Sequence, residues 1–352
     1  MKELLFSLVR LALDDESVVV CPKLSEKQWN QLFSLACRHN VAGLVAESVK
    51  GLADEVRPSE DVCLKFVAMQ GMTISDFQHK LQVAQQLQRF YAEHHLKVAF
   101  LKGFQLCRYY PQQELRSFSD LDIYLTHEDG SKAIEPAWAV GDRFVEKELD
   151  SSVNRALHHH TTFEYCGVHV ENHFDFIAQY GSRKAKAYER ELKSMPVNSP
   201  DFNALFLMRH MASHFAAEHV SIRHLVDWML FLKNEGDKIN WGKVKRVYVA
   251  QGMMPFVEVV AAILKTYLGY ECPYLVASSD ERLRERVVNE ILYGEFQDDM
   301  PVPTQVVRRI AFKWRRRWQG RWKHNLCTNT PWMVDLCYGI VAKIMKPRTI
   351  LH

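Results

Sequence analysis

Apolar residues follow two different spacings along this chain of 352 residues. Spacings of three and four dominate the first 95 residues and return between residue 201 and about residue 294, which places apolar side chains on one face of a helix. Residues 96–178 instead carry short apolar runs that alternate with polar positions, as strands do. The pattern predicts an α+β protein with an N-terminal helical unit at 1–95, a sheet-bearing core at 96–178 and a C-terminal helical unit at 179–352.

The N-terminal helices have recognisable limits. Residues 1–14 and 26–50 are predicted as amphipathic helices, and residues 59–95 as one long helix. Ser25 is followed three positions later by Gln28, which is the pattern of a capping box and favours a helix start at this point.

The predicted core has a defined order of elements. A buried strand at 97–101 is followed by Gly103, which permits a tight turn, and by a short helix at 104–110 that Pro111 ends. A second strand at 119–125 alternates acidic and apolar positions. The remaining predicted elements of the core are a helix at 128–140 and a β-hairpin at 161–176 that turns near Cys166-Gly167.

Two carboxylates on the second predicted strand are the main candidates for chemistry. Asp120 and Asp122 are two residues apart, so on a strand they face the same side, about 6.5 Å apart, while Leu121 points into the core. Carboxylate oxygens are the ligands that Mg²⁺ and Mn²⁺ prefer. The pair therefore indicates a divalent-metal site, although two acids on a partly exposed strand also occur merely for solubility.

Several short motifs surround this acid pair in a fixed order. They are Leu101-Lys102-Gly103, Tyr110-Pro111, Arg116, Asp120-Leu121-Asp122, Val170-Glu171-Asn172-His173, Leu207-Met208-Arg209-His210 with His214, and Ile222-Arg223 with Asp227-Trp228. In this order they resemble the motifs of the bacterial nucleotidyltransferase family proteins, which are part of the polymerase-beta-like nucleotidyltransferase superfamily. The resemblance extends over about residues 30–235.

The resemblance implies a small mixed sheet of the nucleotidyltransferase type, flanked by N- and C-terminal helical units. It also implies metal-dependent transfer of a nucleoside monophosphate from a nucleoside triphosphate to a hydroxyl or amine acceptor, with release of pyrophosphate. Asp120 and Asp122 would bind Mg²⁺ or Mn²⁺, and Glu171 would be the third ligand and the base for the acceptor's proton.

The assignment of Glu171 depends on the predicted hairpin. On its second arm Glu171 and His173 are two residues apart and therefore share a face. Two alternatives stand beside the catalytic role: this face is simply exposed to solvent, or Asp175 takes the role because the register is displaced.

The resemblance implies a set of substrate-binding residues as well. Lys102 would add a point charge and Arg116 a bidentate contact to the triphosphate, whereas the alternative for Lys102 is a solvent-exposed charge at a strand end. His210 and His214 lie four residues apart on one helix face, a spacing that also suits zinc binding or packing in the core. The complete set of expected substrate- or phosphate-binding residues is Lys102, Gly103, Arg116, Ser119, His173, His210, His214, Arg223 and Asp227.

Two departures from the superfamily leave a second interpretation open. Phe104 follows Gly103 where the best-studied members carry a serine that contacts phosphate, and 16 residues separate Gly103 from Asp120. The alternative to an enzyme is therefore a noncatalytic protein of the same fold that senses nucleotides or binds a partner.

The composition indicates the class of protein and the compartment in which it is expected. Hydrophobic residues make up 47% of the chain, enough for sizeable cores, yet no apolar stretch approaches the roughly 20 residues of a membrane span. Arg10 follows too short an apolar run for a secretory signal. The eight cysteines are scattered without framework spacing, which is typical of a reducing compartment and predicts a cytoplasmic protein.

Positive charge is concentrated in the last 52 residues, where eleven Lys or Arg accompany a single acid, Asp335. Among these bases Trp314, Trp318 and Trp322 recur every four residues and so share one helical stripe. Three interpretations of residues 304–324 remain: peripheral contact with an anionic membrane surface, binding of nucleic acid, or docking of the tryptophans on the protein itself. The apolar run at 332–344 predicts a last helix.

Overall fold

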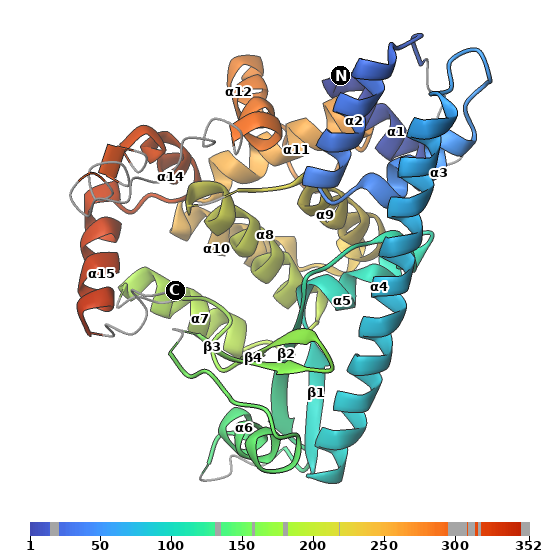
Figure 1. Cartoon of the computed structure of the whole chain (residues 1–352). Helices are drawn as coiled ribbons and strands as arrows, with labels where there is room; N and C mark the ends of the chain where they lie inside the picture. The colour runs from blue at the N-terminus through green and yellow to red at the C-terminus, as the bar shows by residue number, and fades with distance from the viewer. Residues whose placement is uncertain are drawn as a thin grey trace. The chain divides into compact units, whose positions relative to one another are not determined.

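The structure is a computed structural model in which the contacts divide the chain into two compact units (Figure 1). Unit 1 comprises Met1–Met72 and Leu207–Trp332, and unit 2 comprises Thr73–Phe206 and the segment that begins at Met333. The three-segment division expected from the sequence stays a prediction. The described residues are 1–14, 21–130, 135–156, 159–178, 182–217, 219–294, 308, 314–315 and 318–345, of which 339–345 are described by their backbone alone.

Unit 2 contains a four-stranded mixed sheet with the order β1-β2-β4-β3. The central pair β2 and β4 is parallel, whereas β1 pairs with β2, and β3 with β4, in the antiparallel sense. The prediction of an α+β protein with a small mixed sheet is therefore confirmed. The strands are β1 (Leu96–Phe100), β2 (Asp120–His127), β3 (His160–Tyr165) and β4 (Val168–His173).

The hairpin of the core follows the prediction, whereas the turn expected at Gly103 is wrong, because Gly103 lies within a helix and the positive φ is at Lys102. β3 and β4 are joined at Cys166 and Gly167, both with positive φ, as a tight turn requires. Between β1 and β2 the chain forms α5 (Lys102–Leu106) and a 3₁₀ turn that ends at Tyr109, before Pro111. This 3₁₀ turn is Cys107–Tyr109, and the other short elements of unit 2 are a second 3₁₀ turn at Gln113–Leu115 and the helix α7 (Arg183–Lys193).

The helix predicted at 128–140 is wrong in its position. Gly130 lies in a turn with φ of +68° and donates its N–H to the carbonyl oxygen of His127, a geometry that no helix start provides. The helix α6 (Ala137–Glu148) begins after Pro136, whose ring restricts φ to helix-compatible values.

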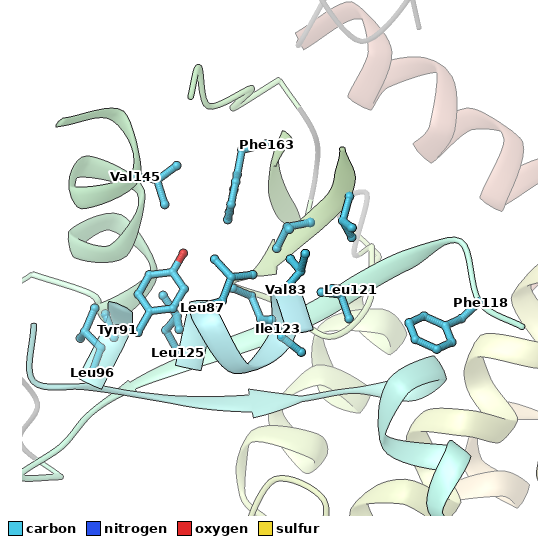
Figure 2. Packing of buried hydrophobic residues seen from close by; sticks show 14 of the residues in the cluster. Val83, Leu87, Tyr91, Leu96, Phe118, Leu121, Ile123, Leu125, Val145 and Phe163 are labelled. Carbon is cyan, nitrogen blue, oxygen red and sulfur yellow. The ribbon is translucent and has the colours of Figure 1, made fainter. Parts of the chain in front are cut away.

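The odd-numbered side chains of β2 build the core of unit 2. Leu121, Ile123 and Leu125 are almost fully buried against the long helix α4 (Glu60–Glu93) and α6, as Figure 2 shows. Burial of each such side chain contributes about 1.5–3 kcal/mol. Because alternate residues of a strand face opposite sides, the even-numbered side chains of β2 are directed away from this core. The other labelled members of the cluster are Val83, Leu87, Tyr91, Leu96, Phe118, Val145 and Phe163.

Unit 1 is helical. The capping box predicted at Ser25 and Gln28 is confirmed, since each residue's side chain accepts a hydrogen bond from the other's backbone N–H. The single helix predicted at 26–50 is wrong, because Asn40 has a φ of +56° and interrupts it. The helices assigned to unit 1 are α1 (Lys2–Leu13), α2 (Glu26–Arg38), α3 (Ala42–Lys50), α9 (Ile222–Glu235), α10 (Trp241–Gln251), α11 (Met254–Leu268), α12 (Glu281–Tyr293) and α14 (Arg321–Cys327).

Three helices remain, of which two pass from one unit into the other and one is the last described helix. The long helix α4 and the helix α8 (Pro200–Ala217) each pass from one unit into the other. The last helix, α15 (Trp332–Met345), corresponds to the one predicted at 332–344. Within the described part of the chain no single helix is long and apolar enough to cross a membrane, and only the pair α10 and α11, bent by 120°, passes that test together.

About half of the basic segment 304–324 lies outside the described residues. Where it is described, its tryptophans contact other rings of unit 1: Trp314 and Trp318 lie 5.8 and 5.7 Å from Trp332. The ring of Trp322 packs edge-on against Phe215 at 5.7 Å. Trp314 and Trp318 are nevertheless 46% and 49% exposed, and membrane or nucleic-acid binding by this segment stays a prediction.

Candidate active site

The parallel pair of strands brings three carboxylates to one region. Asp122 on β2 is the register partner of Glu171 on β4, and Asp120 is the partner of His169. Register partners on adjacent strands face the same side of a sheet, and so do residues two apart on one strand. Asp120, Asp122 and Glu171 therefore share the polar face, opposite the core.

Lys102 turns toward these acids. It begins α5 with a φ of +41°, a conformation that is uncommon for a residue other than glycine. Its Nζ lies 2.6 Å from Oδ1 of Asp122 and 3.9 Å from Oε2 of Glu171. The side chain of Lys102 is only 15% exposed, so the alternative of a solvent-exposed charge at a strand end is wrong.

His173 completes the contacts around the two carboxylates. Its Nε2 lies 2.9 Å from Oδ1 of Asp122 and 3.4 Å from Oε2 of Glu171, while its Nδ1 lies 3.2 Å from the carbonyl oxygen of Asp175. The imidazole has no exposed surface. The side chain of Asp175 pairs instead with Lys193, so the displaced register in which Asp175 would replace Glu171 is wrong.

Burial and neighbouring charges act in opposite directions on the acids. Burial alone would raise the pKa of Asp122, but Lys102 and His173 hold it well below its ordinary value. For Glu171 burial is likewise outweighed, and the pKa is lowered by His173 and Lys102. The pKa of Asp120 is raised, first by burial and then by the negative charge of Asp122. The pKa values of Asp122 and Glu171 are thus lowered, whereas that of Asp120 is raised.

Two further histidines lie beside this cluster. His160 on β3 is the register partner of His173, and its Nε2 lies 3.6 Å from Oε1 of Glu171. Burial lowers the pKa of His160 to about 4 and that of His159 to about 2, so both rings are neutral at physiological pH. Their only signal in the sequence is the run of three histidines at 158–160, and His158 lies outside the described residues.

The donor atoms converge closely enough to hold a metal ion. One oxygen each of Asp122 and Glu171 and one ring nitrogen of His173 all lie within 4.8 Å of one another. Ring nitrogens of His159, His160 and His173 form a second such group. Asp120 lies outside both groups, and its Oδ1 accepts a hydrogen bond of 2.9 Å from Oγ of Ser119. The residues present therefore fit a divalent cation.

A comparison of the whole chain with known families gives one match. A model of the family described as "Uncharacterised nucleotidyltransferase" matches residues 25–269, which is well over half of the chain. The chain belongs to this family. The match covers β1 to β4 and every residue of the site described above. No curated protein matches the chain, and no solved structure does.

In this member of the uncharacterised nucleotidyltransferase family, Gly103 permits a close approach of Arg116 and Phe118 to α5. A Cβ at this position would lie 3.0 Å from Nη1 of Arg116 and 3.1 Å from Cβ of Phe118. Arg116 itself is 3% exposed. Lys80 was not expected from the sequence; it lies on α4, is almost buried, and donates hydrogen bonds to the carbonyl oxygen of Phe118 and to Asp76.

Four of the residues expected in the substrate site belong to unit 1 of this nucleotidyltransferase-family chain. On α8 the rings of His210 and His214 are 4.3 Å apart, and both lie about 6 Å from His224. Arg223 and Asp227 lie on α9, and Asp227 is 6% exposed. Zinc binding by His210 and His214 and a role of all four in substrate binding stay predictions.

Proposed function

We propose that the chain is a metal-dependent nucleotidyltransferase of the polymerase-beta-like kind, which moves a nucleoside monophosphate from a nucleoside triphosphate to a hydroxyl or amine acceptor and releases pyrophosphate. The observation that carries the proposal is the register of Asp122 with Glu171, with Asp120 two residues away on the same face. Three carboxylates on adjacent strands can hold divalent cations at a point where a triphosphate binds.

The side chains divide the work according to their charges. Asp120, Asp122 and Glu171 would hold Mg²⁺ or Mn²⁺, which when bound neutralises charge that develops on the phosphates. Glu171 remains ionised at neutral pH because its pKa is lowered, so it can accept the proton of the attacking hydroxyl or amine. In this proposal the three carboxylates position the metal ions, and Glu171 also takes up the proton.

Two cationic side chains would bind the triphosphate. Lys102 already lies between Asp122 and Glu171, and the phosphates of an incoming nucleotide offer its ammonium a second set of anionic oxygens. Arg116 lies directly behind Gly103 and would contribute a bidentate contact. Both contacts position the α-phosphorus near the carboxylates, which is the main requirement of phosphoryl chemistry.

One observation favours the alternative of a noncatalytic nucleotide sensor. Phe104, at the position of the superfamily's phosphate-binding serine, packs among other rings, 4.8 Å from Phe100 and 5.9 Å from Phe118. A phenyl ring offers no hydrogen bond to phosphate. Lys102 and Arg116 must therefore replace the serine if the protein is an enzyme.

The decisive experiment is the transfer of label from α-phosphate-labelled ATP, GTP, CTP and UTP, with Mg²⁺ or Mn²⁺ and with cell extract as the source of acceptor. We expect a labelled product with the wild type and none with the double variant Asp120→Asn/Asp122→Asn. A matched control is Asp54→Asn/Asp61→Asn, which makes the same chemical change at exposed positions and should label as the wild type does. Nucleotide binding without transfer would contradict the proposal of an enzyme and support that of a noncatalytic nucleotide sensor.

A further inference from the structure

The orientation of His173 is determined from both sides of its ring. Its Nδ1 lies 3.2 Å from the carbonyl oxygen of Asp175, and a carbonyl oxygen only accepts hydrogen bonds, so Nδ1 must carry the proton. By the same reasoning Nε2, 2.9 Å from Oδ1 of Asp122, carries a proton as well while no cation is bound. A metal ion that displaces this second proton would leave the lone pair on Nε2. This nitrogen is directed at the carboxylates of Asp122 and Glu171, at 2.9 and 3.4 Å.

This arrangement is the one that metal-binding histidines adopt. Such a histidine almost always donates its second ring N–H to a carbonyl or carboxylate oxygen, which fixes the tautomer and directs the other nitrogen at the metal. Here the backbone of Asp175 supplies that acceptor, and Nε2 converges with one oxygen each of Asp122 and Glu171 within 4.8 Å. Three donors on two adjacent strands thus form one ligand set.

His173 takes a place that a third carboxylate would otherwise fill. Asp120 is absent from both convergent groups of donors that the described residues form, and its carboxylate is bonded to Ser119. His173, in contrast, belongs to both groups. The group of donors that includes the acids is therefore two oxygens and one nitrogen.

The surroundings of this set are rich in further ring nitrogens. His160 lies 3.6 Å from the second oxygen of Glu171, and its ring centre is 5.1 Å from that of His173. The Nδ1 atoms of His159 and His160 are buried and have no hydrogen-bond partner among the residues that the structure describes. Buried polar atoms of this kind usually find a partner in the protein, in water, or in a bound ligand or ion.

Mg²⁺ prefers oxygen ligands and near-ideal octahedral geometry, whereas imidazole nitrogen suits first-row transition ions. Mn²⁺ shares the preference of Mg²⁺ for carboxylate oxygen but, as a transition ion, also accepts an imidazole nitrogen. We infer that His173 is a metal ligand together with Asp122 and Glu171, and that the site therefore takes a first-row transition ion such as Mn²⁺ in preference to Mg²⁺. The inference rests on the proposed function for the presence of a metal and adds both a ligand and the class of ion.

The test measures metal binding to the full chain without nucleotide. Free Mn²⁺ is followed by its electron paramagnetic resonance signal, and Mg²⁺ affinity by competition. We expect the wild type to bind Mn²⁺ at least about tenfold more tightly than Mg²⁺, and His173→Gln to lose about tenfold or more in Mn²⁺ affinity with a smaller loss for Mg²⁺. The matched control is His127→Gln, because His127 lies at the other end of β2 and contacts the carbonyl oxygen of Glu135.

A second measurement needs no variant, in case His173→Gln does not fold. Pulsed electron paramagnetic resonance of Mn²⁺ on the wild type should show coupling to ¹⁴N, which changes to ¹⁵N coupling when the histidines are ¹⁵N-labelled. No Mn²⁺ binding, equal affinities for the two ions, or the absence of nitrogen coupling would each overturn the inference. Label transfer without nitrogen coupling would leave the proposed function standing, and nitrogen coupling without transfer would leave this inference standing.

Discussion

Asp122 and Glu171 are register partners on the parallel strands β2 and β4, with the ammonium of Lys102 in contact with both. Adjacent parallel strands require a crossover connection, and here it passes through α6 and β3 before β4 begins. Asp122 is buried and Glu171 is partly buried, and two carboxylates this close repel each other unless cations compensate them. Lys102 and His173 provide that compensation, so the acid pair and its cationic partners form one electrostatic unit.

This unit predicts opposite effects on stability for the two acids of β2. Asp122→Asn leaves Lys102 and His173 without their common partner and should lower the free energy of unfolding by about 3 kcal/mol. Asp120→Asn removes a charge whose pKa is raised by burial and by Asp122, so at pH 7 it should leave stability unchanged or raise it by up to about 1 kcal/mol. Urea unfolding of both variants measures the difference.

Both asparagine variants are nevertheless expected to lose nucleotidyl transfer. A variant that is as stable as the wild type but inactive, as we expect for Asp120→Asn, would identify a functional carboxylate rather than a structural one. Equal destabilisation by the two substitutions would contradict the charge arrangement described here.

Two substitutions of Lys102 should distinguish the effect of its charge on stability from the effect of its strained backbone conformation. Lys102→Met removes the ammonium but keeps a side chain at a φ of +41°, whereas Lys102→Gly removes the ammonium and suits that φ. Both variants should be less stable than the wild type, because Asp122 and Glu171 lose a cation. The glycine variant should be the more stable of the two by about 1 kcal/mol. Chemical denaturation measures this, and a methionine variant as stable as the glycine variant would show that the backbone is unstrained.

Much of the site's local geometry follows from the sequence. Asp120 and Asp122 share a face because strands alternate, and Glu171 and His173 share a face for the same reason. The hairpin turn at Cys166-Gly167 carried its own signal in the glycine. These features depend on positions close in the chain, where periodicity and turn chemistry act directly.

The features that could not be predicted from the sequence depend on contacts between segments that are distant in the chain. The pairing of Asp122 with Glu171 depends on the register of two strands, which no local pattern encodes. The turn of Lys102 toward the acids needs a positive φ at a residue that is not glycine, and tertiary contacts must hold it there. The same applies to Asn40, where a break at positive φ splits one predicted helix into two.

Two helical glycines make a matched pair for testing the close approach of Arg116 and Phe118 to Gly103. In Gly103→Ala the new Cβ would meet Arg116 and Phe118 at 3.0 and 3.1 Å, so the variant should shift the guanidinium and reduce transfer on the order of tenfold. In Gly71→Ala nothing lies within 4 Å, so the helix α4 should gain about 0.5–1 kcal/mol without loss of activity. Activity and thermal unfolding of both variants measure the contrast, and equal activities would contradict it.

The buried His39 in unit 1 should make the free energy of unfolding depend on pH. The residue is fully buried; its Nε2 lies 3.2 Å from the carbonyl oxygen of Leu292, and its Nδ1 accepts the N–H of Ile222. A neutral ring satisfies both contacts, whereas an imidazolium would set two N–H groups against each other at Nδ1. Burial, assisted by the charges of His219 and Arg38, accordingly lowers the pKa of His39 to about 4.

Because the folded pKa of His39 lies below the unfolded value of 6.5, the unfolded state takes up the proton first as pH falls. The stability linked to this residue is complete above pH 6.5 and is lost as pH falls toward about 4, which amounts to about 2 kcal/mol between pH 7.5 and 5.0. In His39→Gln this part of the pH dependence should disappear, whereas His95→Gln, at a side chain that is 88% exposed, should keep the slope of the wild type. Urea unfolding at both pH values measures how the free energy of unfolding changes with pH. If His39→Gln shows the same change as the wild type, the pKa of His39 does not differ between the folded and unfolded states.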